Sequence, residues 1–94
     1  MPMANPVHPG RLILVALDGE SVTTAARCMG IARCSLSRVI NGKASITPDM
    51  AYRLGKYFGS STGLWLNLQN QYDIWAVEHR EVQPKVIPRS EAKC

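Results

Sequence analysis

Residues 22–41 read VTTAARCMGIARCSLSRVIN, and this run predicts a short helix, a tight turn and a second short helix. The small side chains of Ala25 and Ala26 allow the two helices to approach closely. Gly30 permits the left-handed backbone conformation that ends the first helix within one residue. The apolar residues expected to close the wedge between the helices are Met29, Ile31, Leu36 and Val39. This layout is typical of a DNA-binding helix-turn-helix.

The outward side of the second helix carries small, polar or basic residues, namely Arg33, Cys34, Ser35, Ser37 and Arg38. Residues 21–48 hold four basic residues and no acid, whereas the other residues hold seven of each sign, so the net charge of +4 falls on this segment. Such a distribution is the electrostatic footprint of phosphate binding. An ordinary helical hairpin with a solvated basic face has the same apolar spacing, but the charge favours DNA binding.

The composition bounds the class of protein. A chain of 94 residues with 46% hydrophobic and 19% charged residues predicts one globular domain, and its small size favours self-association as a way to enlarge the core. No apolar run approaches the ~20 residues of a membrane span. The start of the chain has no secretory signal, since a basic region followed by an apolar region is missing. We therefore expect a cytoplasmic protein that does not contact a membrane.

No residue pattern indicates catalysis, a metal or a cofactor. Cys28, Cys34 and Cys94 are odd in number and lack ligand spacing, so they are expected to be free thiols. His8 and His79 have no nearby ligand partner, and no glycine-rich phosphate loop occurs. Cys34 lies on the predicted DNA-facing side, which raises a redox-sensing hypothesis against the plainer interpretation of a tolerated small side chain.

The remaining sequence predicts one helix before this motif and two after it. His8-Pro9-Gly10 opens a helix that ends at Leu17, and Thr47-Pro48-Asp49 opens another that ends at Phe58. The expected apolar face of the earlier helix consists of Leu12, Ile13, Val15, Ala16 and Leu17, and that of the later helix of Met50, Ala51, Leu54, Tyr57 and Phe58. The helix at 33–40 follows Ala32, which is a poor N-cap because its side chain has no acceptor.

The last predicted helix, at about 62–79, is unusually rich in apolar and aromatic residues. One stripe consists of Leu64, Leu68, Tyr72 and Trp75, and it is widened by Trp65, Leu66 and Val77. The candidate interface residues are Leu64, Trp65, Leu68, Tyr72 and Trp75. Because this surface exceeds what four short helices need, we expect part of it to form a dimer interface; the alternative is that both tryptophans belong to the core of one subunit. The expected organisation is an arm at 1–7, an all-α helix-turn-helix domain of five helices at 8–79 with its motif at 22–41, and a flexible tail at 80–94.

Several separated motifs together closely resemble the HigA/VapI family of antitoxins. They are HPG at 8–10, GIARCSLSRVINGK at 30–43, ITPDMAYRL at 46–54, and WLNLQ at 65–69 with Tyr72-Asp73. The resemblance spans about residues 8–78. It implies a lambda-repressor-like domain of the Cro/repressor group that forms a homodimer and binds a palindromic operator.

The resemblance also implies two functions: neutralising a HigB-type toxin, which is an mRNA-cleaving ribonuclease, and repressing the protein's own operon. By position, Arg33, Cys34, Ser35, Ser37 and Arg38 match the DNA-facing side of the recognition helix. For Arg33 and Arg38 the alternatives are a bidentate contact to guanine and a contact to phosphate alone. The lesser candidates, chiefly for backbone contacts, are Ser35, Ser37, Asn41 and Lys43. The chain departs from the family pattern at Ala32, where serine is common, and at Cys34, where a long polar residue is common. These departures bear on the operator sequence.

Three hypotheses remain open at this point. The first is a DNA-binding antitoxin, and the second is a transcriptional repressor without a toxin. The third is a protein inhibitor that holds its partner through apolar helices or the tail and whose DNA binding is vestigial. For toxin binding, the arm and the first helix are the candidate surface.

Overall fold

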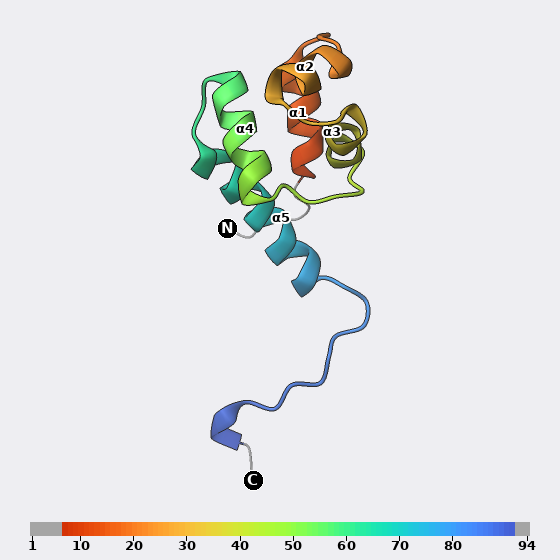
Figure 1. Cartoon of the computed structure of the whole chain (residues 1–94). Helices are drawn as coiled ribbons and strands as arrows, with labels where there is room; N and C mark the ends of the chain where they lie inside the picture. The colour runs from red at the N-terminus through yellow and green to blue at the C-terminus, as the bar shows by residue number, and fades with distance from the viewer. Residues whose placement is uncertain (1–6, 92–94) are drawn as a thin grey trace.

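The computed structural model describes residues 7–91, and this part of the chain is helical without strands. The helices are α1 (Pro9–Leu17), α2 (Val22–Met29), α3 (Arg33–Ile40), α4 (Pro48–Phe58) and α5 (Thr62–Glu78), followed by the short 3-10 helix η1 (Arg89–Glu91). Helices α1 to α4 gather at one end, α5 runs out from beneath them, and the segment after α5 extends away (Figure 1). The predicted five-helix, all-α class is confirmed. The expected arm lies outside the described residues except for Val7.

Side-chain caps explain why most helices begin where they do. The hydroxyls of Ser21, Thr47 and Ser61 each accept a hydrogen bond from the backbone N–H three residues later, at the start of α2, α4 and α5. His8 caps α1 through Nδ1, which accepts from the N–H of Gly10 at 2.9 Å. Ala32, as expected, makes no side-chain cap on α3.

The turn between α2 and α3 is closed by backbone hydrogen bonds. Gly30 has φ 73° and ψ 31°, which is the left-handed conformation that its sequence position predicts. The N–H of Ile31 donates to the carbonyl of Ala26 at 3.0 Å, and the N–H of Gly30 donates to that of Arg27 at 3.1 Å. These two bonds form a Schellman motif, so α2 stops abruptly and α3 can turn across it.

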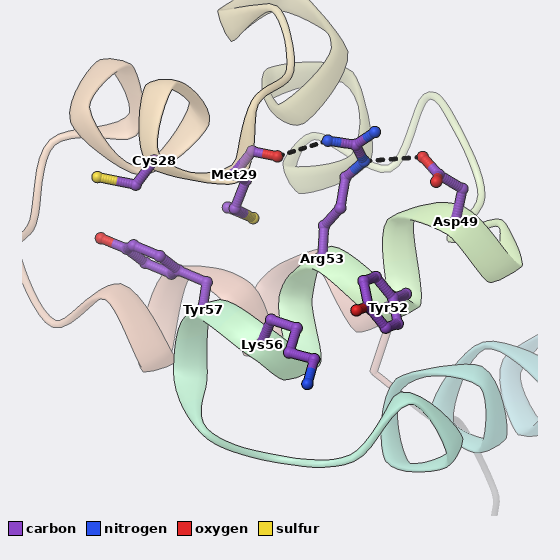
Figure 2. A pocket seen from close by; sticks show the side chains of 7 residues that line it. All are labelled: Cys28, Met29, Asp49, Tyr52, Arg53, Lys56 and Tyr57. Carbon is purple, nitrogen blue, oxygen red and sulfur yellow. Dashed lines mark hydrogen bonds and ion pairs between the residues drawn. The ribbon is translucent and has the colours of Figure 1, made fainter.

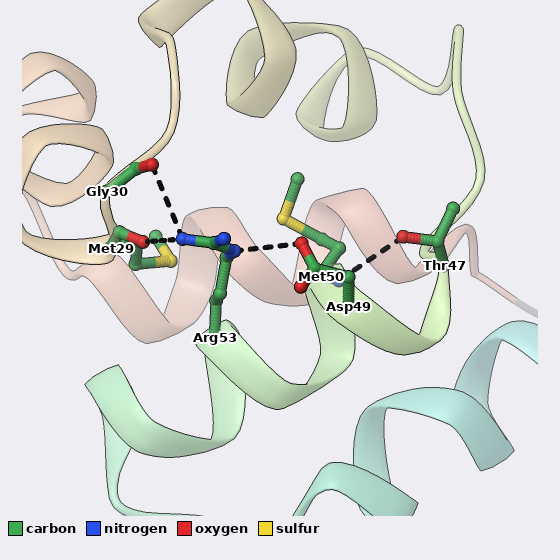
Figure 3. A network of polar contacts seen from close by, with 6 residues as sticks. All are labelled: Met29, Gly30, Thr47, Asp49, Met50 and Arg53. Carbon is green, nitrogen blue, oxygen red and sulfur yellow. Dashed lines mark hydrogen bonds and ion pairs between the residues drawn. The ribbon is translucent and has the colours of Figure 1, made fainter.

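Arg53 of α4 hydrogen-bonds to the backbone of this turn (Figure 3). Its Nη1 donates to the carbonyl of Met29 at 2.6 Å and, more weakly, to that of Gly30 at 3.3 Å. Its Nε pairs with the carboxylate of Asp49 at 2.9 Å, one helical turn earlier. The guanidinium therefore joins the C-terminal carbonyls of α2 to α4, where a positive charge is favoured.

The core lies between the helices and is formed by Ile13, Leu17, Ala25, Ala26, Met29, Leu36, Val39, Ile40, Ile46, Met50, Ala51, Leu54 and Trp65. The expectation for α1 was too broad, because Val15 and Ala16 are exposed and only Ile13 and Leu17 of the predicted face are buried. A short helix packed on few neighbours buries a narrow stripe. In α4, Tyr57 and Phe58 are half-buried at the edge of the core.

Helix α1 begins directly against the end of α3. A Cβ added to Gly10 would lie 2.7 Å from the carbonyl oxygen of Ile40 and closer still to that of Val39. No side chain fits in that space, so glycine is required for this close approach. The contact fixes the C-terminal end of α3 against the start of α1.

Candidate nucleic-acid interface

Helix α3 has one buried face and one exposed face. Leu36, Val39 and Ile40 are buried, with Leu36 fully inaccessible. On the opposite side Arg33, Cys34, Ser35 and Arg38 are exposed, and Ser37 is half-buried. The five predicted residues of this helix therefore lie outside the core and share one accessible surface, which we call the recognition face.

The segment after α3 continues the recognition face. Asn41 is exposed, and its Nδ2 donates to Ser37 Oγ at 3.2 Å, one helical turn earlier. Lys43 is also exposed, while its backbone N–H donates to the carbonyl of Arg38 at 2.8 Å. The structure thus places Asn41 and Lys43 beside the end of α3, where the sequence predicted backbone contacts.

Within residues 7–91 the only ion pair joins Arg53 to Asp49. The basic side chains on and around α3 therefore have no acidic partner in this part of the chain. Arg27, Arg33, Arg38 and Lys43 are all exposed. Their positive charge is therefore available to an anionic partner. An α-helix with its side chains is about 10–12 Å in diameter, which matches the ~12 Å width of the major groove, so the exposed face of α3 has the dimensions to enter it.

A second surface feature lies apart from α3. A hollow of about 480 Å³ between α2 and α4 is lined by Cys28, Met29, Asp49, Tyr52, Arg53, Lys56 and Tyr57 (Figure 2). The guanidinium of Arg53 already hydrogen-bonds to the carbonyls of Met29 and Gly30 and pairs with Asp49, so the hollow marks the gap between α2 and α4 that this side chain spans. No group of side chains suited to holding a metal ion occurs among the described residues.

The cysteines fall into two groups. Cys28 and Cys34 are free and exposed. Cys34 lies on the recognition face and Cys28 at the hollow beside α4. Cys94 lies outside the described residues.

The predicted dimer residues of α5 have different surroundings. Trp65 is 4% exposed, and its Nε1 donates to Ser60 Oγ at 2.9 Å, so it belongs to the core of its own subunit and its interpretation as an interface residue is wrong. Leu64 is exposed, whereas Leu68, Tyr72 and Trp75 are half-buried. Tyr72 packs edge-on against His8, with ring centroids 4.8 Å apart. The sequence interpretation missed Ile74, which is 59% exposed beside Val77 at 52%.

Comparisons with known proteins agree with this architecture. The chain is 44% identical to an uncharacterised helix-turn-helix transcriptional regulator, YddM, of Escherichia coli. The matched region of 80 residues covers 83% of this chain and 85% of that protein. It is 36% identical to an addiction module antidote protein of the HigA family from Coxiella burnetii, with a TM-score of 0.74 over 86% of this chain and 99% of that one. The chain belongs to the HigA family.

A further neighbour of this HigA-family protein is the antitoxin HigA of Pseudomonas aeruginosa, solved with the higBA promoter. It is 28% identical, with a TM-score of 0.72 over 87% of this chain and all of that one. These relatives are regulators and antitoxins, which agrees with the expectation of a binding protein that is not an enzyme. No family model matches the chain. Within the described residues, none of the helices has the length and apolarity that crossing a membrane requires.

Proposed function

We propose that this HigA-family protein acts in the cytoplasm as a dimer that binds a palindromic operator through the recognition face and represses its own operon. The observation that carries the proposal is the coincidence of the exposed face of α3 with basic residues that have no acidic partner in the described part of the chain. The relative from Pseudomonas aeruginosa that was solved with the higBA promoter supports promoter DNA as the partner. A fold that buried α3 would not permit it.

The roles of the recognition-face residues follow from their positions. In a helix-turn-helix the N-terminal residues of the second helix lie nearest the base edges, so we assign Arg33, Cys34 and Ser35 to the groove floor. Arg38 and Ser37, one turn later, are assigned to the groove wall, and Asn41 and Lys43 to the sugar-phosphate backbone. Arg33 and Arg38 are the two side chains able to bind guanine bidentately.

Operator binding is tested with Arg33→Ala and Arg38→Ala on operator and random DNA across a range of salt. A base contact should cost roughly 1–3 kcal/mol on operator DNA alone, whereas a phosphate contact should weaken binding to both and lower the salt slope by about one. Arg89→Ala, which removes an equal charge from the exposed tail, is the matched control. If neither α3 variant binds more weakly than this control, the recognition face is wrongly assigned.

We propose that α5 supplies the dimer contact, with Leu64, Leu68, Tyr72 and Trp75 joined by Ile74 and Val77. Ile74 and Val77 are neighbours on one helical face, and exposed apolar side chains on the projecting half of α5 support an interface there (Figure 1). Ile74→Asp is expected to yield monomers in light scattering, whereas Val86→Asp in the exposed tail leaves the mass unchanged. A dimeric Ile74→Asp protein contradicts this interface.

A second function, neutralisation of a HigB-type toxin, is favoured by the family and by the exposed apolar side chains of α1. Leu14 is 49% exposed, Val15 is 74% exposed and the preceding Val7 is 54% exposed. In cells whose growth is arrested by a small basic ribonuclease encoded beside this gene, co-expression of this protein should restore growth. The Val15→Asp variant should lose this rescue without binding the operator more weakly. Full rescue by Val15→Asp rules out this surface; the lack of such a neighbouring gene favours the repressor without a toxin.

A further inference from the structure

Gln69 of α5 is a buried polar side chain with two hydrogen bonds. It is 3% exposed. Its Oε1 accepts from the backbone N–H of Ile46 at 2.8 Å, across 23 residues of sequence, and its Nε2 donates to Asp73 Oδ1 at 2.8 Å. Both ends of the amide are therefore engaged.

The chemistry of the two partners fixes the orientation of the amide. A backbone N–H only donates and an ionised carboxylate only accepts, so the oxygen of Gln69 must face Ile46 and its nitrogen must face Asp73. A flipped amide would place its nitrogen, a donor, against the N–H of Ile46, and its oxygen, an acceptor, against the carboxylate of Asp73. Asp73 is exposed, yet it decides how the buried amide of Gln69 is presented to Ile46.

The bond falls on the segment that joins α3 to α4. At the α3 end, the N–H of Gly42 donates to the carbonyl of Val39, and the N–H of Lys43 donates to the carbonyl of Arg38. At the α4 end, Thr47 caps the next helix. Between these two anchors Gln69 supplies the acceptor for the N–H of Ile46, so α5 holds the segment that carries Lys43.

We propose that Gln69 is a positioning residue for operator binding: it fixes the α3–α4 segment so that Lys43 reaches a phosphate. The inference rests on the proposed function, which assigns Lys43 to the DNA backbone. A side chain needed only to fill space would be apolar, because a buried amide is accommodated only when each of its polar groups is paired. Here the pairing is directed at the one segment of backbone that continues the recognition face.

The test compares Gln69→Met with Gln71→Met, which alters an exposed glutamine of the same helix. Gln69→Met leaves the Ile46 N–H without its acceptor, so its hydrogen exchange should be roughly tenfold faster. The slope of log affinity against log salt should fall by about one per subunit, as for a lost phosphate contact. Lower stability alone would not change this slope, and Gln71→Met should leave both quantities at wild-type values.

A cycle with Lys43→Gln separates the two proposals. Once Lys43→Gln has lowered the salt slope, adding Gln69→Met should lower it no further, because both act on the same contact. If Lys43→Gln leaves affinity and slope unchanged, the Lys43 contact is refuted and the positioning role falls with it. If Lys43→Gln lowers the slope but Gln69→Met does not, only the positioning role is overturned.

A pair of milder variants keeps the test decisive if Gln69→Met fails to fold. Asp73→Ala and Asp73→Asn both remove one exposed negative charge, but only asparagine retains an oxygen that accepts from Gln69 Nε2. Asp73→Ala should therefore show severalfold faster exchange at Ile46 and a lower salt slope than Asp73→Asn. Equal exchange and equal slopes in the two variants overturn the proposal.

Discussion

Serine at position 32 should stabilise the protein, because α3 is the one helix among α1 to α5 that begins without a side-chain cap. Ala32 has φ −69° and ψ 144°. Those angles lie close to the −65° and 132° of Ser21, whose hydroxyl caps α2. Because the backbone is already in capping geometry, a serine hydroxyl at position 32 would reach the N–H of Ser35, which now donates to the carbonyl of Ala32 at 3.1 Å, and would give it a better acceptor.

The size of the gain follows from the bond that is added. Replacing an alanine N-cap by serine is worth about 1 kcal/mol, within a range of roughly 0.5–2 kcal/mol. In a domain of this size, 1 kcal/mol raises Tm by about 4–8 °C. Position 32 is exposed, so neither packing nor desolvation offsets the gain.

Thermal unfolding followed by circular dichroism measures the effect of Ala32→Ser. The reciprocal variant Ser61→Ala removes an existing cap from α5 and should lower Tm by a similar amount. Combined, the two substitutions should bring Tm back near the wild-type value, since they change the caps of two different helices and share no hydrogen-bond partner. A Tm for Ala32→Ser at or below wild type would refute the reasoning, because the backbone at position 32 would then not be in capping geometry in solution.

Three further outcomes are expected. Gly10→Ala should unfold the domain or lower Tm sharply in thermal melts, because its methyl group has no room beside the carbonyls of α3. Arg53→Met should lower the free energy of unfolding by roughly 2 kcal/mol in urea titrations, because it removes the hydrogen bond to the Met29 carbonyl. Asp49→Asn removes only the exposed ion pair and should lower the free energy of unfolding by less than about 1 kcal/mol. Equal losses in the two variants would contradict the capping role of Arg53. Alkylation by N-ethylmaleimide should block operator binding in gel shifts, and Cys34→Ser should resist it; continued sensitivity in Cys34→Ser would assign the effect to another thiol.

Local signals carried most of the sequence prediction. Gly30, the cap residues and the spacing of Leu36 and Val39 act within one turn of the chain, so the helices and the exposed side of α3 were predictable. The depth to which a side chain is covered depends on neighbours that are distant in sequence. For that reason Val15 was wrongly expected in the core and Trp65 at an interface.

Gln69 shows the same limit for polar residues. Its partners are a loop N–H 23 positions earlier and a carboxylate on its own helix. A glutamine in an amphipathic helix is ordinarily on the solvent side, and nothing in residues 62–79 alone indicates that this one points inward. The motif that carries the family resemblance contains Gln69, but its physical role appears only when α5 lies against the α3–α4 segment.

The division of α3 into two independent faces has a consequence for how such regulators diversify. Leu36, Val39 and Ile40 hold the helix, whereas the one side-chain hydrogen bond that the outward residues form within residues 7–91 joins Asn41 to Ser37, so substitutions that change DNA preference need not disturb the core. Outward residues grafted from another repressor should change the target without a cost to the scaffold. Duplicated copies of one gene are thereby free to acquire new regulatory sites through a few surface substitutions.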